Sequence, residues 1–134
     1  MTNPLPLITI AKFADLLARL QRETPGVLNA TLASADGLTV ASTLRVSQEA
    51  DRVAAMSSSL AGLASALTRE TGHGSPRRLI LESDQGLIVA LQVPLPGGDL
   101  VLAVIASTEA VLGQLLWACR HAVAQLGEAA AAPA

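Results

Sequence analysis

Residues 31 to 43, TLASADGLTVAST, place two stretches of hydroxyl side chains around an Asp-Gly pair, a composition that could bind phosphate or position a nucleophile. A phosphate-binding loop needs a run of glycines and a lysine and leads directly into a helix, and this stretch has none of these features. Neither His73 nor His121 has a neighbouring serine and acid in a known nucleophilic arrangement. Apolar residues recur with period two on both sides of Asp36 and Gly37, which predicts a β-hairpin because glycine accepts positive φ. We therefore interpret the stretch as a turn between two strands rather than a reactive site.

The remaining reactive side chains are isolated from one another. Cys119 is the only cysteine, so the chain has no internal disulfide and no thiolate metal cage, which suits a reducing compartment. It falls in a helical apolar series, which predicts a buried, inert thiol. His73 lies in the loop TGHGSP, where we expect it to be solvated rather than a ligand. We expect no enzymatic activity, no catalytic residue, no metal and no cofactor.

The composition narrows the class of partner. The 134 residues fit one domain and carry a formal net charge of −2, with a single lysine and scattered arginines, so nucleic acid is disfavoured as a partner. The longest apolar runs are far shorter than the roughly 20 residues that span a bilayer. The start of the chain lacks a basic segment followed by a cleavage site. We expect a cytoplasmic protein without membrane insertion.

Periodicity predicts an alternating series of helices and strands. The predicted helices cover residues 9–23, 47 to about 70, and Ser107 to about Leu126, with the hairpin after the first and the strands RRLILE, LIVALQV and LVLAVIA after the second. Residues 87–91 and 100–106 are apolar on both faces, as in central strands, whereas the other strands are half polar and belong nearer the edges. The domain is expected over residues 8–126, between a flexible N-terminal segment, 1–7, and a flexible alanine-rich tail, 127–134.

The long helix has an unusual composition on one side. A ridge of larger apolar residues follows a 3-4-3-4 spacing and is predicted to pack on the sheet: Val53, Met56, Leu60, Leu63 and Leu67. The rest of the helix is small, although a solvated face would normally carry Lys and Glu. We interpret this small face as the seam with the same helix of a second copy, with the interface residues Ala54, Ser58, Ala61, Gly62 and Ser65. The alternative is a merely solvated face whose composition has drifted.

The order of elements, with the segments PGVLNATLASADGLTVAS and SSLAGLASAL, resembles the roadblock/dynein light chain family in its stand-alone bacterial form. The resemblance covers about residues 8 to 126. It implies an α+β fold with a five-stranded antiparallel sheet in the order 2-1-5-4-3, two helices on one face and one long helix on the other. It also implies a non-catalytic protein that dimerises through the long helix and the third strand. Many members bind small Ras-like GTPases, and the bacterial members similar to this chain include regulators of the gliding-motility polarity GTPase.

The expected function is therefore that of a homodimeric regulator or scaffold of a small Ras-like GTPase. The alternative is a purely structural assembly subunit of a signalling or motility complex, with no effect on nucleotide turnover. If the third strand pairs with its own copy around Ile80, then Arg78 of one chain faces Glu82 of the other. Trp117 is predicted to lie outside the main core, where it either covers the first helix or marks a second contact surface for a partner.

Overall fold

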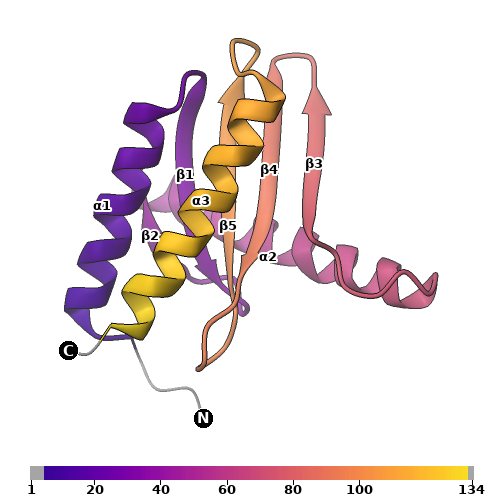
Figure 1. Ribbon diagram of the computed structural model, residues 1–134, viewed down its shortest axis with the longest axis horizontal. Coiled ribbons are helices and arrows are strands. Elements are labelled where there is room, and N and C mark those ends of the chain that lie inside the picture. The colour runs from indigo at the N-terminus through magenta and orange to yellow at the C-terminus, as the bar shows by residue number, and fades with distance from the viewer. Residues whose placement is uncertain (1–4, 133–134) are drawn as a thin grey trace.

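The computed structural model describes residues 5–132, which form three helices and a single sheet (Figure 1). The elements in chain order are α1 (Leu7–Glu23), β1 (Val27–Ser34), β2 (Thr39–Ser42), α2 (Ser47–Glu70), β3 (Arg78–Ser83), β4 (Gly86–Val93), β5 (Leu100–Ser107) and α3 (Leu112–Ala131). All strand pairings are antiparallel, in the order β2-β1-β5-β4-β3. Helices α1 and α3 lie on one face of the sheet and α2 crosses the other (Figure 1). The predicted fold class and strand order are confirmed.

The hydroxyl-rich stretch is the β1–β2 hairpin. Gly37 adopts φ +89°, and the Ser34 amide donates to the Leu38 carbonyl oxygen at 2.9 Å across the turn. The Thr31 and Ser42 hydroxyls hydrogen-bond to each other at 2.8 Å across the two strands. Thr31 is fully buried, so this pair satisfies a hydroxyl that would otherwise lose its water. The stretch thus forms the predicted β-hairpin.

The main core lies between the sheet and the α1–α3 layer. Its largest fully buried members include the only phenylalanine, Phe13, together with Leu17, Leu32, Leu102, Leu115 and Leu126. Strands β4 and β5 contribute most of the sheet side of this core, in agreement with their apolar character on both faces. Cys119 is also part of the core and is fully buried.

The first helix begins earlier than its apolar pattern predicts. It starts at Leu7, after Pro6 as the N-cap residue, rather than at residue 9. Proline has a fixed φ and no N–H to satisfy, so it suits a helix start. The end of the segment predicted to be flexible, residues 1–7, is therefore part of this helix, and its residues 1–4 lie outside the described residues.

Both predicted ends of the last helix are wrong. Ser107 ends β5, and its hydroxyl accepts a hydrogen bond from the Glu109 amide at 3.2 Å in the following turn, so α3 begins only at Leu112. The helix then continues to Ala131, beyond the predicted end at Leu126. Alanine has the highest helix propensity, and the alanines near this end are partly buried against the core. Residues 133 and 134 of the predicted tail lie outside the described part of the chain.

Candidate protein-interaction surface

Helix α2 packs on the sheet through its small residues. Ala50, Ala54 and Ser57 are buried beneath it. The Ser58 hydroxyl donates to the Ser34 carbonyl oxygen at 2.8 Å, so this side chain bonds to a strand of the same chain. Small side chains allow the helix backbone to approach the sheet closely, and the hydroxyls find partners there.

The larger apolar residues of α2 point away from the sheet. The exposed fractions of Met56, Leu63 and Leu67 are 61%, 70% and 64%, and we call these three residues the outer stripe. The other two members of the predicted ridge, Val53 and Leu60, are half-buried at its flank. The prediction that this ridge packs on the sheet is therefore wrong, because the 3-4 spacing identifies an apolar face without identifying what covers it.

The five residues predicted to form a seam with a second copy of the helix lie in different environments. Ala54 is fully buried in the single chain and offers no surface to a second copy. Ser58, Ala61 and Ser65 are half-buried toward the sheet, and the Ser65 hydroxyl lies 3.5 Å from the Gln92 amide nitrogen. Gly62 is exposed, and nothing in the described residues lies within 4 Å of the position of an added Cβ. The fold thus does not bring these five residues together on an outward surface.

Strand β3 is a terminal strand of the sheet that pairs only with β4. It leaves apolar side chains accessible on both faces, with exposed fractions of 37% for Ile80 and 38% for Leu81. Ile80 pairs with Val89, which is buried in the core on the α1–α3 side, so Ile80 lies on that face. Because side chains alternate along a strand, Arg78 and Glu82 share the face of Ile80. The predicted pairing of Arg78 with Glu82 of a second copy around Ile80 stays a prediction.

The backbone of β3 also has one unpaired side. Ser83 and Gly86 close a two-residue turn into β4 and so form a hydrogen-bonded pair. Residues that form such pairs alternate along the strand, so Leu81 bonds to β4 while Ile80 turns its N–H and C=O outward. An outward row of donors and acceptors beside apolar side chains is a template for pairing with another strand.

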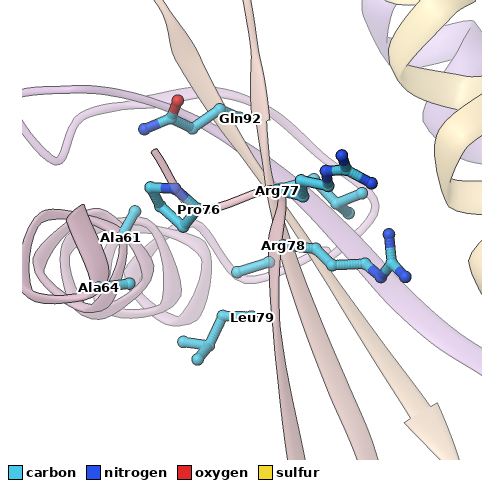
Figure 2. Close-up of a pocket in the computed structure, with 9 residues that line it drawn as sticks. Ala61, Ala64, Pro76, Arg77, Arg78, Leu79 and Gln92 are labelled. Carbon is cyan, nitrogen blue, oxygen red and sulfur yellow. The ribbon is translucent and has the colours of Figure 1, made fainter. Parts of the chain in front are cut away.

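The space between α2 and β3 is filled rather than hollow. Figure 2 shows Ala61 and Ala64 of the helix beside Pro76 and Leu79, while Arg77 and Arg78 extend away from the helix. The cavity between them has a volume of about 20 Å³, which is room for about one water molecule. Figure 1 shows the C-terminal turns of α2 projecting beyond the β3 edge. This end of the molecule therefore presents exposed apolar side chains rather than a ligand pocket.

The side chains capable of nucleophilic or acid–base chemistry are separated. Burial raises the pKa of the Cys119 thiol from its ordinary value of 9.0 to about 12, so the thiol stays protonated at neutral pH. His73 Nδ1 lies 2.8 Å from the Thr71 hydroxyl in the exposed loop after α2. Within residues 5–132 there is no group of three or more His, Cys, Asp and Glu side chains that could hold a metal ion.

Trp117 lies outside the core, as predicted, with an exposed fraction of 60%. Its ring stacks on the His121 ring one turn later in α3, with a centroid distance of 5.0 Å and an interplanar angle of 11°. The stack leaves a large aromatic ring at the surface of α3.

None of the helices in the described part of the chain has the length and apolar character needed to cross a bilayer.

Comparison with known proteins identifies relatives of this architecture. The family model described as "Roadblock/LC7 domain" matches residues 13–106. A Roadblock/LC7 domain from Streptomyces avermitilis is 27% identical with a TM-score of 0.78, and the match covers 84% of this chain and 92% of that one. MglB from Myxococcus xanthus is 14% identical with a TM-score of 0.80, covering 94% of this chain and 92% of that one. The gliding protein MglB from Thermus thermophilus is 18% identical with a TM-score of 0.79, covering 94% of this chain and 93% of that one. Comparison with curated proteins gave no match.

Proposed function

Since this chain belongs to the Roadblock/LC7 domain family, we propose that it acts as a non-catalytic, homodimeric regulator or scaffold of a small Ras-like GTPase. The observation that carries the proposal is the pair of unpartnered apolar surfaces, the outer stripe of α2 and the bare edge of β3. A monomer that left both in water would be prone to associate through its sheet edge. The fold similarity to gliding-motility MglB proteins supports a GTPase pathway.

The second copy pairs along β3 in antiparallel register. With the two-fold axis at Ile80, the outward N–H and C=O of Ile80 meet those of the partner's Ile80. The same register sets Arg78 of one protomer opposite the partner's Glu82, so opposite charges meet on one face of the joined sheet. The C-terminal turns of α2 project past this edge (Figure 1), and the two copies of α2 lie on the same face of the joined sheet, where the partner's α2 covers the outer stripe. One related MglB structure is described as a tetrameric arrangement, which supports self-association in this fold.

Substitution of Ile80 tests the dimer. Ile80→Pro removes an outward donor and leaves the β4 hydrogen bonds in place, so we expect a folded monomer in sedimentation velocity. Ile80→Val keeps the donor and the β-branched side chain, so it is the matched control and remains dimeric. A dimer of undiminished affinity in Ile80→Pro, with a native circular dichroism spectrum, would refute pairing through this edge.

The GTPase contacts the dimer at two places, the Trp117 patch and the part of α2 that the second copy leaves exposed. Trp117 is the only tryptophan, so its fluorescence reports on this patch alone. In the free dimer we expect red-shifted emission that iodide quenches readily, and protection when the bound GTPase covers the ring. If a GTPase binds and the emission of Trp117 does not change, the contact is restricted to α2 and Trp117 serves only in packing.

Nucleotide turnover separates regulation from passive assembly. Each small Ras-like GTPase of the host is assayed for GTP hydrolysis and nucleotide exchange with and without this protein. A changed rate identifies a regulator, and binding without a changed rate identifies a scaffold. If no such GTPase binds at all, the GTPase proposal fails and the structural assembly role is favoured.

A further inference from the structure

A second, polar site lies far from the interaction surface, at the opposite end of the sheet. It is an open groove of about 540 Å³ between α1 and the segment that leads from β2 into α2. Its floor includes Ala14 and Ala18 of α1, and its polar rim includes Gln21, Arg22, Thr43 and Arg45. Small-molecule sites have volumes of about 300 to 1,000 Å³, so the groove has a suitable size.

The groove is a local concentration of positive charge in an acidic protein. Arg22 comes from the end of α1 and Arg45 from the connection after β2, and the fold brings them to one site. None of the residues lining the groove carries a carboxylate, although the whole chain has a net charge of −2. Arginine presents a planar fork of donors that matches the oxygens of phosphate and carboxylate groups.

The other polar side chains of the groove differ in whether they already have hydrogen-bond partners within the protein. The Ser42 hydroxyl is paired with Thr31 at 2.8 Å, and the Thr43 hydroxyl accepts from the Ala30 amide at 2.9 Å, so both are engaged within the sheet. Gln21 Oε1, by contrast, is buried and has no hydrogen-bond partner within the described residues. This oxygen has almost no accessible surface, so it does not define the ligand, and Arg22 and Arg45 are the groups left to bind one.

We propose that this groove binds a small molecule that carries compact oxyanion groups, with Arg22 and Arg45 as its charged partners. The site is separate from β3 and from the outer stripe of α2, so the ligand binds without occupying the surface assigned to the second copy. Binding at the groove bridges α1 to the connection that precedes α2, and it stabilises the folded protein by an amount that grows with the logarithm of the ligand concentration above Kd.

The test uses pyrophosphate and citrate as probes, titrated by calorimetry at constant ionic strength into the full chain. Pyrophosphate represents phosphate-bearing ligands and citrate carboxylate-bearing ones, and citrate also carries a hydroxyl donor. We expect saturable binding of at least one probe, weakened about tenfold or more by Arg22→Gln and again by Arg45→Gln, as for hydrogen bonds to charged groups. The probe that binds more tightly identifies the class of oxyanion.

Two further variants make the result specific. Ala18→Glu adds a carboxylate to an exposed position on the floor of the groove and should abolish binding without disturbing the core. Arg19→Gln with Arg120→Gln removes two exposed charges outside the groove and is the matched control for the double arginine variant. Equal weakening in this control, or no saturable binding of either probe at millimolar concentration, would overturn the proposal. Neither result would bear on the dimer or on the GTPase.

Discussion

Substitution of Leu63 by alanine separates the two possible roles of the outer stripe. Full burial of a leucine side chain stabilises by about 1.5 to 3 kcal/mol. Since 70% of Leu63 is still exposed in the single chain, burial against a second copy would contribute about 1 to 2 kcal/mol per protomer. Both protomers lose this contribution in the variant, so the dimer weakens by about 2 to 4 kcal/mol, which is roughly a 30- to 700-fold higher Kd.

Sedimentation equilibrium measures the dimer Kd, and urea unfolding of the dilute monomer measures its stability. The monomer should change by no more than about 0.5 kcal/mol, because an exposed helical leucine contributes little to folding. Leu38→Ala is the matched control, since Leu38 is 67% exposed at the β1–β2 turn, away from the β3 edge. If Leu63→Ala leaves the Kd unchanged, or if Leu38→Ala raises it as much, the outer stripe is not the dimer surface.

Three smaller predictions follow from individual contacts. Ser58→Ala removes one of the two donors to the Ser34 carbonyl oxygen, the other being the Gly37 amide, and should lower the free energy of unfolding by about 1 kcal/mol; no loss in urea titration would contradict the sheet-facing role of Ser58. Gly62→Ala should raise that free energy by about 1 kcal/mol, because an added Cβ meets nothing within 4 Å in the described residues. If the variant weakens the dimer instead, Gly62 lies at the contact between the two copies of α2. Burial raises the pKa of Cys119 from 9.0 to about 12, so its contribution to stability is fully present below pH 9 and is lost as the pH rises through 12. The urea midpoint should therefore fall more steeply above pH 9 than that of Cys119→Ala, and parallel curves would argue against a buried thiol.

The sheet was predictable because its signals are local. The Asp36-Gly37 turn, the alternation on either side of it and the two-sided apolar strands all depend on neighbours a few residues apart. The strand order came from the family resemblance, and the apolar character of β4 and β5 agrees with their central positions. Element ends were less predictable, because Pro6 and the terminal alanines extend α1 and α3 beyond their apolar patterns.

The anion groove was not predictable from spacing. Arg22 and Arg45 belong to different segments and lie 23 positions apart in the sequence, where they read as scattered charges. Only the packing of α1 beside β2 brings them to one rim. The lack of a partner for Gln21 Oε1 is likewise a property of the folded chain, since the sequence alone does not show which side chains lose their water.

Helix α2 faces the sheet with the side opposite to the predicted one, although both of its faces are visible in the sequence. A helix that carries a ridge of large residues and a face of small ones can bury either against its own sheet. Burying the small face brings the helix close and satisfies the Ser58 hydroxyl on the strand backbone. Burying the ridge would instead leave that hydroxyl in water, where it is also satisfied, so hydrogen bonding alone does not decide between the two. The sheet surface beneath α2 is itself lined by small, buried residues such as Ala33, Ala90 and Ala103, so two small surfaces pack together at close range. The large side chains are thus left outward, where only another protein surface can cover them.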